Sequence, residues 1–197
     1  MNKKEIEKIE IEELEGFLGR KISSYPEKSD NIITENQVKE VRDYLEKEYN
    51  FSEKIYKNQE PKFLIVDIES EQYNSLCFSD FNIHDEKRIF KFYLFNCKDN
   101  LPPIAVLFHE FGHAIHLAYT GGMTSIPKPF LKIIKIFGFE RIEELEEEQQ
   151  CEVFADILSM GLMLDSPFEK YDIFTPIHRK HKEAYKELVK QIFKLLP

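Results

Sequence analysis

The sequence predicts an α+β fold in which a small, mostly antiparallel sheet packs on one buried helix and additional helices flank both. Three observations support this prediction. Segments rich in β-branched and aromatic residues follow one another between residues 63 and 96. Amphipathic helical periodicity lies on both sides of that region. A strongly apolar helix is expected directly after the last strand, at residues 102–120.

Length and composition describe an ordinary globular chain. Its 197 residues fit one domain, with 42% hydrophobic and 32% charged residues. Within this single domain we expect an N-terminal helical region at residues 1–50, a core at residues 60–165 and a C-terminal helix at residues 176–197.

Charge and cysteine content exclude several classes of protein. A net charge of −9 and a pI near 5.3 argue against general nucleic-acid binding. No stretch has the apolar core of a signal peptide or the ~18 apolar residues of a membrane helix. Cys77, Cys97 and Cys151 are odd in number and widely spaced, which favours free thiols in a reducing compartment. We therefore expect a cytoplasmic protein that does not associate with membranes.

The chain before the sheet is expected to be helical. Apolar residues among glutamates and lysines predict an amphipathic helix at residues 3–19, and a loop follows at residues 23–31. Thr34 has the chemistry of an N-cap and begins a second helix. The apolar side of that helix consists of Val38, Val41, Leu45 and Tyr49.

Three segments predict strands, at residues 63–68, 76–81 and 88–96. A turn at residues 84–87 makes the last two strands a hairpin. The segment at residues 89–95 carries the strongest strand pattern, and the sequence leaves open whether it lies at the edge or at the centre of the sheet.

Four helices are expected after the strands. The Pro-Pro pair at residues 102–103 suits the first turn of a helix that the Gly-Gly pair at residues 121–122 ends. A helix at residues 125–137 could line or gate a cleft, or could simply pack on the core. A long helix at residues 141–164, acidic at its start, and a last helix near residues 177–195 complete the chain.

The helix at residues 102–120 contains an H-E-x-x-H pentapeptide, which begins at His109 and ends at His113. Residues i and i+4 lie on one face of a helix, so these two histidines can bind one cation. Glu110 projects from nearly the same side, and Gly112 removes a side chain where another element, or a substrate strand, could approach closely. The alternative is a core helix with two incidental histidines, because a zinc site also needs a third protein ligand.

Glu152 and Asp156 are the candidates to complete such a site. They are again four residues apart, and they stand in an apolar stretch where a carboxylate must be paired or coordinated. We expect Glu152 to be the third ligand and Asp156 to accept a hydrogen bond from a ligand imidazole, which fixes the tautomer of that ring. Glu148, one turn earlier, is the reserve candidate for the third ligand. The alternative is that both acids form salt bridges with lysine or arginine.

Two histidines and one glutamate leave one tetrahedral position for water, as in catalytic zinc sites. Bound Zn²⁺ lowers the pKa of that water from ~15.7 towards ~7 and polarises a carbonyl group beside it. Glu110 would take the proton of the water and pass it to the leaving amine. The motifs therefore predict a Zn²⁺ cofactor, with Glu110 as the catalytic base.

The two motifs resemble those of the gluzincin metallopeptidases, and more closely those of the ImmA/IrrE family. The zinc helix of that family reads H-E-[L/F]-G-H-A-x-x-H, and residues 109–116 here read HEFGHAIH. Its second motif reads E-x-x-A-N-x-F-A-x-x-L-L-M-P, which matches here at Glu152, Ala155 and Leu162, with Asp156 in place of the asparagine. The resemblance covers residues 60–165. It implies a zincin-like fold and hydrolysis of peptide bonds in an intracellular, often regulatory, protein.

Other roles rest on chemistry alone. Zincin peptidases commonly bind substrate as an added strand at an exposed sheet edge. A donor to the tetrahedral oxyanion is also expected, and the candidates for it are Tyr119, Tyr171, His178 and His181. His116 is expected to be packed or exposed, and His84 to lie in a turn.

Our hypothesis from the sequence is a zinc metalloendopeptidase that acts on a protein or peptide substrate. The rival hypothesis is a non-catalytic regulatory or interaction protein on the same scaffold. Hydrolysis of a non-peptide amide is a lesser alternative.

Overall fold

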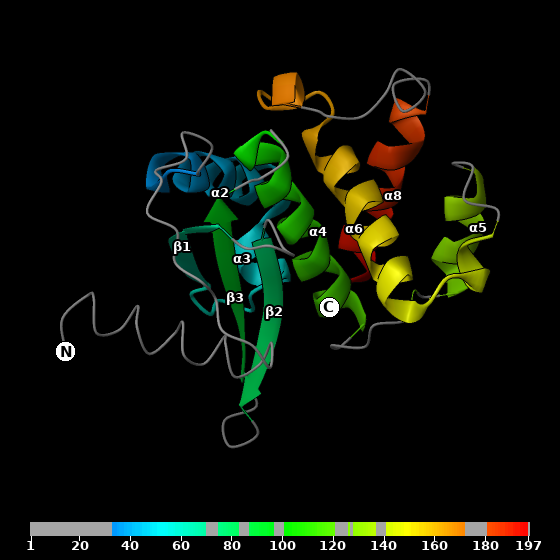
Figure 1. Cartoon of the computed structure of the whole chain (residues 1–197). Coiled ribbons are helices and arrows are strands. Elements are labelled where there is room, and N and C mark those ends of the chain that lie inside the picture. Colours follow the sequence, from blue (N-terminus) through cyan, green and yellow to red (C-terminus); the bar gives the residue numbers. More distant parts are fainter. Residues whose placement is uncertain are drawn as a thin grey trace.

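The computed structural model describes residues 33–69, 75–82, 87–96, 101–120, 126, 128–136, 141–171 and 181–196. The architecture is α+β, as predicted. A three-stranded sheet lies at one side of the molecule, one helix packs against it, and further helices lie beyond that helix (Figure 1). Among the described residues, no helix is long and apolar enough to cross a membrane.

The sheet consists of β1 (Lys62–Glu69), β2 (Ser75–Asn82) and β3 (Lys87–Asn96), in the order β1-β3-β2. The β2–β3 pair is antiparallel, which confirms the expected hairpin. The β1–β3 pair is parallel, so the expectation of a mostly antiparallel sheet is wrong and the sheet is mixed. The chain reverses direction twice between β1 and β3, so the first and third strands run the same way once β3 lies in the middle. The segment at residues 89–95 is therefore central.

Helix α2 (Glu35–Tyr49) begins at Thr34, as predicted. The Thr34 hydroxyl accepts a hydrogen bond from the Gln37 amide at 3.2 Å, and the Gln37 side chain accepts one from the Thr34 amide at 2.9 Å. This capping box satisfies two backbone donors of the first turn. Asn50, in the left-handed conformation, ends the helix and leads into the short helix α3 (Phe51–Lys54), which the sequence analysis did not predict.

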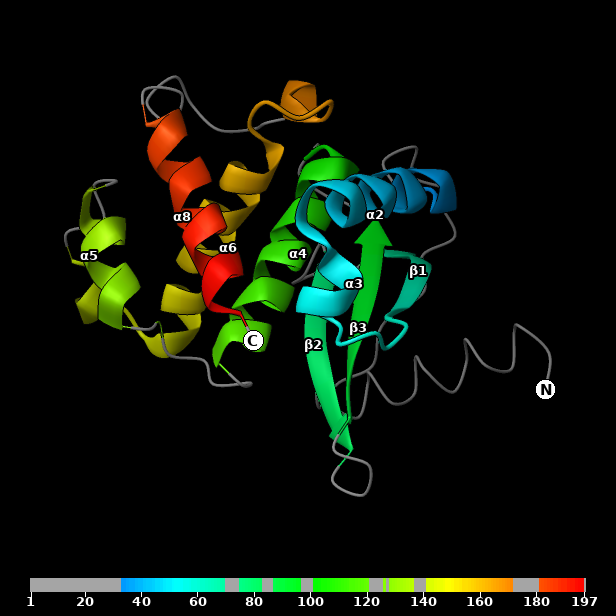
Figure 2. The same cartoon turned by 180° about the vertical axis from the view of Figure 1, so that it is seen from behind.

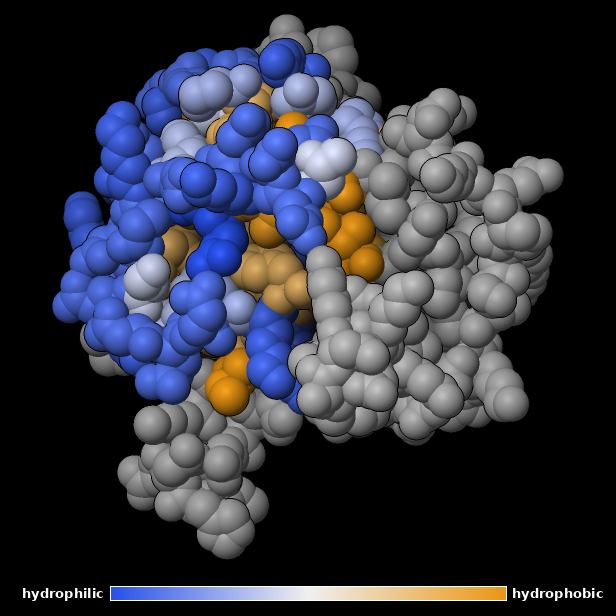
Figure 3. All heavy atoms as spheres, turned by 90° about the vertical axis from the view of Figure 1, so that its left-hand side faces the viewer, coloured by the Kyte–Doolittle hydropathy of each residue, from blue (hydrophilic) through white to orange (hydrophobic). Residues whose placement is uncertain are grey.

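Helices α2 and α3 cover one end of the sheet, as Figure 2 shows from behind. Side chains of α2 on the apolar stripe are buried, including Val41 and Leu45. Figure 3 shows the side of the molecule that lies to the left in Figure 1, and the described residues on this side are mostly hydrophilic, with several apolar areas between them. This two-sided pattern is the reason that an otherwise charged segment folds against the core.

Four helices follow the sheet in the described part of the chain. They are α4 (Pro103–Thr120), α5 (Lys128–Ile136), α6 (Glu147–Met163) and α8 (Lys182–Leu195). Helix α4 lies between the sheet and α6, and α8 packs on the far side of α6 (Figures 1 and 2). The long helix expected at residues 141–164 begins only at Glu147, after a short 3-10 helix at Ile142–Glu144. Glu146 caps α6 because its carboxylate is stabilised by the free amides of the first turn.

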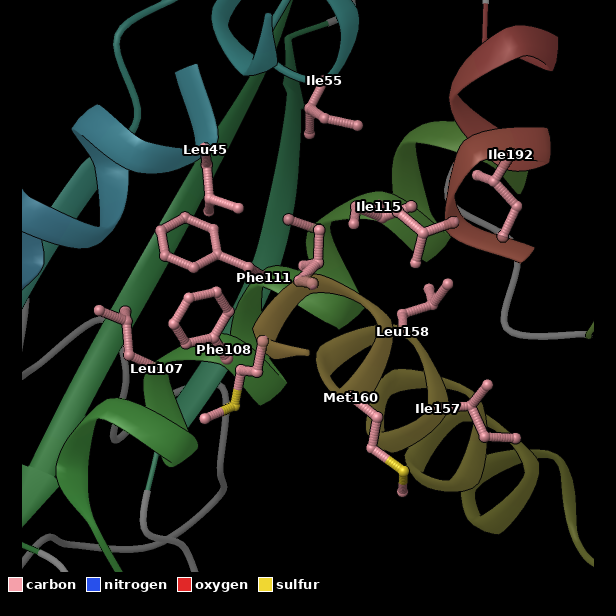
Figure 4. Close-up of a cluster of buried hydrophobic side chains, with 14 of the residues drawn as sticks. Leu45, Ile55, Leu107, Phe108, Phe111, Ile115, Ile157, Leu158, Met160 and Ile192 are labelled. Carbon is pink, nitrogen blue, oxygen red and sulfur yellow. The ribbon is translucent and has the colours of Figure 1, made fainter. Parts of the chain in front are cut away.

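The core lies where α4 meets the sheet, α2, α3 and α6. Phe108 and Phe111 of α4 point towards Leu45 of α2, and Ile115 lies near Ile192 of α8 (Figure 4). All of these side chains are buried. Each contributes about 1.5–3 kcal/mol by leaving water. This packing fixes the rotation of α4 about its own axis, and therefore the direction in which its polar side chains point.

Several expectations fall outside the described residues. They are the helix at residues 3–19, the loop at 23–31, the turn residues 84–86 with His84, the Gly-Gly pair at 121–122, His178 and the start of the last helix at 177–180.

Candidate metal centre

Helices α4 and α6 touch through their backbones at Gly112 and Ala155. A Cβ atom built on Gly112 would lie 3.0 Å from the Cα atom of Ala155 and would also clash with the Ala155 carbonyl oxygen. Real Cβ contacts are longer than this, so only glycine fits at this position. The expected close approach at Gly112 is therefore present, and it brings together the polar side chains on either side of the contact.

Three of these side chains point at one place. His109 and His113 stand one turn apart on α4, and their Nε2 atoms are 3.0 Å apart. Glu152 of α6 places Oε2 at 3.1 Å from Nε2 of His109 and Oε1 at 3.4 Å from Nε2 of His113. A tetrahedral site with bonds of 2.0–2.1 Å separates its ligand atoms by about 3.3 Å. The spacing of the three side chains matches that of zinc ligands.

Asp156 lies behind His109. Its Oδ1 atom is 2.7 Å from Nδ1 of His109, one helical turn along α6 from Glu152. A carboxylate accepts, so Nδ1 of His109 carries the proton and donates it. In a neutral imidazole, Nε2 then presents a lone pair to the Glu152 carboxylate. Two acceptors in contact repel unless a proton or a metal cation lies between them, so the donor set fits a cation.

The pKa values of His109 and Glu152 also indicate that the site favours positive charge. Burial lowers the pKa of His109, but the hydrogen bonds with Asp156 and Glu152 outweigh burial and raise this pKa to about 10. Burial raises the pKa of Glu152, but its hydrogen bonds with His109 and His113 hold that pKa well below its usual range. The site therefore attracts positive charge. A divalent cation satisfies that attraction without placing a proton on His109.

The ligands differ in their access to solvent. The side chains of His109 and His113 are 21% and 15% exposed, whereas that of Glu152 is 56% exposed. Glu110 is buried, at 3% exposure, and its charge helps to raise the pKa of His109. The site thus has one open side and one buried carboxylate close to the ligands. Openness of this kind is typical of catalytic zinc sites, whereas structural sites are closed by four protein ligands.

Other candidates lie elsewhere. Within the described ranges, the one group of three or more residues suited to a metal is His109, His113 and Glu152, so the reserve ligand Glu148 is not among them. The ion pairs that the structure gives Glu152 and Asp156 are with histidines rather than with lysine or arginine. His116 is packed, because it is 1% exposed and its ring lies edge-on to Phe154 at 5.0 Å.

The structure places the oxyanion candidates in other contacts. Tyr119 packs edge-on against Phe130 of α5 at 5.2 Å. The Lys170 ammonium lies 4.9 Å from the centre of the Tyr171 ring. His181 occupies the N-cap position of α8. None of these contacts involves the metal ligands, so the oxyanion donor remains a prediction without an assigned residue.

A pocket of about 360 Å³ opens between α2 and α3, with Arg42, Tyr56 and Phe111 in its lining. Phe111 is two residues from both His109 and His113, which places it about 200° around the helix. The pocket therefore lies on the opposite side of α4 from the metal ligands. None of its lining residues belongs to the metal centre.

Sequence reasoning did not identify which imidazole Asp156 would contact. The two pairs at i and i+4 place two side chains on each helix, but the crossing of the helices decides the partners. The small residues Gly112 and Ala155, which touch at the crossing, are a signal of it in the sequence.

Comparisons with known proteins do not assign a function. No family model, curated protein or solved structure matches this chain. The functional argument therefore depends on the geometry of the metal centre.

Proposed function

We propose that this protein is a zinc-dependent metalloendopeptidase of the gluzincin type, with a zincin-like fold and the ImmA/IrrE family as its nearest resemblance. The observation that carries the proposal is the convergence of Nε2 of His109, Nε2 of His113 and the Glu152 carboxylate, at mutual distances of 3.0–3.4 Å. The ligands come from two different helices, and 38 residues lie between His113 and Glu152 in the sequence. We do not expect three ligand atoms from two helices to converge in this way by chance.

His109, His113 and Glu152 would hold the ion. Bound zinc supplies a water molecule of lowered pKa and polarises a carbonyl group. Nitrogen and oxygen ligands of this kind, without thiolate, suit zinc and hydrolysis rather than electron transfer. The exposed side of the site, at Glu152, is where a substrate carbonyl can enter.

Two carboxylates have different tasks in this proposal. Glu110 receives the proton of the attacking water and delivers it to the leaving amine. Its burial keeps bulk water away from that proton during the transfer. Asp156 holds the proton on Nδ1 of His109, so that Nε2 is available as a ligand and the ring keeps its orientation.

The sheet offers an edge to an extended substrate. Strand β3, at residues 89–95, is central, so the edges of the sheet are β1 and β2, and β2 is the edge strand that packs beside α4. We infer that the substrate backbone pairs with β2, because main-chain hydrogen bonds supply affinity without sequence preference. The substrate would be an intracellular regulatory protein, as the resemblance implies.

One experiment tests the proposal. The purified chain is stripped with a chelator, reloaded with one equivalent of Zn²⁺, and incubated with a denatured protein. We expect cleavage that the chelator abolishes, and a loss of about 10²–10⁴-fold in Glu110→Gln, which removes the base. Metal analysis should still find one zinc per chain in that variant.

The matched control is Glu40→Gln, which changes an exposed acid of α2 in the same way. Its activity should equal that of the wild type. Retained activity in Glu110→Gln would refute the assigned base. Stoichiometric zinc without any cleavage would favour the rival hypothesis of a non-catalytic interaction protein.

A further inference from the structure

The two helices that build the metal centre carry charge of one sign. Helix α4 contains one acidic residue, Glu110, and α6 contains Glu147, Glu148, Glu152 and Asp156. Neither helix contains lysine or arginine, and no such residue occurs from 142 to 169. A divalent cation would neutralise two of these five charges. The surroundings of the bound metal would therefore stay negative.

Nearby cations do not remove this charge from α6. Lys135 of α5 pairs with Glu143 at 2.8 Å, and Arg141 pairs with Glu144. Both acidic partners precede α6, so these two ion pairs do not neutralise the acids of α6. The side chain of Glu148 is exposed, and within the described part of the chain it forms no hydrogen bond or ion pair. It stands one turn before Glu152, on the same face of α6.

We infer that the site prefers substrates with a lysine or arginine side chain within two residues of the bond that is cleaved, and that Glu148 contacts this side chain. The inference rests on the proposed function. Two independent observations meet in it, namely the three convergent ligands and the row of carboxylates beside them. Side chains one turn apart on a helix are about 6 Å apart, which corresponds to about two residues of extended chain. A cationic side chain at that distance reaches Glu148 while the backbone lies over Glu152.

The expected preference is modest because Glu148 is exposed. Exposed ion pairs change binding by about 2- to 5-fold. Glu148 is therefore a specificity-determining residue, and neutral substrates should still be cleaved when it is changed.

A peptide library measures the preference directly. A denatured cell proteome is digested after glutamate, so that lysines and arginines remain inside the peptides, and the zinc-loaded protein then cleaves this mixture. Mass spectrometry of the new termini should show lysine and arginine enriched about 2- to 5-fold at one position near the cut. Glu148→Gln should remove that enrichment, Glu148→Lys should turn it into depletion, and Glu40→Gln should leave it unchanged.

Blocking only the α-amino groups of the library, by acetylation near pH ~6 where the ε-amino groups of lysine stay protonated, separates two sources of positive charge. The enrichment should persist, since it comes from side chains. Its loss on acetylation would overturn the inference and would indicate recognition of a peptide N-terminus. Equal enrichment in the wild type and in Glu148→Gln would overturn the role of Glu148.

A binding measurement separates this inference from the proposed function. Zinc-loaded Glu110→Gln is titrated with a fluorescent nonapeptide that has two lysines beside a central Ala-Leu bond, and with the same peptide carrying two glutamates. The lysine peptide should bind more tightly, and adding Glu148→Gln should weaken it by about 2- to 5-fold. Binding preference without any cleavage would refute the peptidase alone, whereas cleavage without preference in either assay would refute only this inference.

Discussion

Helix α6 makes two close contacts through glycine, and the two differ in what lies beside them. Against α8, a Cβ atom on Gly161 would lie 2.5 Å from Cγ2 of Val189 and 2.7 Å from the carbonyl oxygen of Tyr185, both buried residues. Against α4, a Cβ atom on Gly112 would meet the backbone of Ala155. The first contact is flanked by apolar side chains. The second is flanked by the candidate metal centre.

The comparison separates packing for stability from packing for function. At Gly161 the close approach buries apolar groups, which stabilises the fold directly. At Gly112 it brings imidazole nitrogens and carboxylates within 3.0–3.4 Å, where acceptors repel unless a proton or a cation lies between them. Of these two contacts, the one at Gly112 has this arrangement and the one at Gly161 does not. We therefore expect the two contacts to respond differently to the same substitution.

Gly112→Ala and Gly161→Ala should have the largest contrasting effects. Each adds one methyl group to a contact without room, and each should lower the free energy of unfolding by about 1–3 kcal/mol. Only Gly112→Ala separates α4 from α6 at the ligands, so only this variant should lose zinc affinity, by more than about 100-fold. Thermal melts and competition with a chromophoric chelator measure the two quantities. Equal zinc affinities in both variants would contradict the assignment of Gly112 as the contact that assembles the site.

Asp156→Asn tests the side chain that orients one ligand. The amide keeps the shape of Asp156 but lacks the charge that holds the proton on Nδ1 of His109. We expect zinc affinity to fall by about 10- to 100-fold while the melting temperature of the metal-free protein changes little. The same change at Asp165→Asn, on the loop after α6, should leave zinc affinity unaltered, since Asp165 pairs with Lys182 and Lys186. An Asp156→Asn variant with wild-type affinity would show that its hydrogen bond does not support the ligand.

The pH dependence of stability should distinguish the metal centre from the apolar contact. The folded-state pKa of His109 is about 10, above its ordinary value of 6.5. The stabilisation from protonated His109 is thus complete below pH ~6.5 and is lost as the pH rises towards 10. Glu152 has a lowered pKa, so its contribution is present above its ordinary value and is lost in acid as the pH falls through the folded-state pKa.

Melting of the chelator-treated protein tests this. The difference in melting temperature between the wild type and His109→Gln should shrink between pH 6.5 and pH 9. Zinc should reverse the trend, because metal binding requires unprotonated histidine and grows stronger as the pH rises. A difference that stays constant with pH would mean that His109 is not protonated in the metal-free fold.

The sequence predicted the elements of the fold better than their arrangement. Apolar periodicity and capping chemistry are local, so the N-cap at Thr34, the three strands and α4 were found within a few residues. The pairing of β1 with β3 is not local. The residues of either strand do not indicate its partner or its direction, so the prediction of a mostly antiparallel sheet did not include the parallel β1–β3 pair. The predicted helix at residues 141–164 included the acidic segment before Glu147, whereas the helix begins after the cap at Glu146.

The same division holds for the candidate site. Spacing at i and i+4 placed His109 with His113 and Glu152 with Asp156, since helix geometry alone decides which residues share a face. The meeting of the two pairs depends on the contact between Gly112 and Ala155. A sequence can indicate such a contact by its small residues, but it does not give the crossing direction. The position of an oxyanion donor also depends on how elements distant in sequence pack together, so the sequence did not identify this residue.

Cys151→Ser should have the smallest effect of these variants. Cys151 precedes Glu152 in the chain, yet it is 8% exposed, faces the interior and has a pKa raised to about 11, whereas a metal-binding cysteine is a thiolate. Zinc affinity should therefore change by less than about 2-fold, although the melting temperature can fall because the hydroxyl is buried. Cobalt substitution gives an independent measurement, since thiolate ligands produce an intense charge-transfer band. A band that is present in the wild type and lost in Cys151→Ser would show that sulfur is among the ligands. The two histidines and one glutamate that the contact at Gly112 brings together would then be an incomplete ligand set.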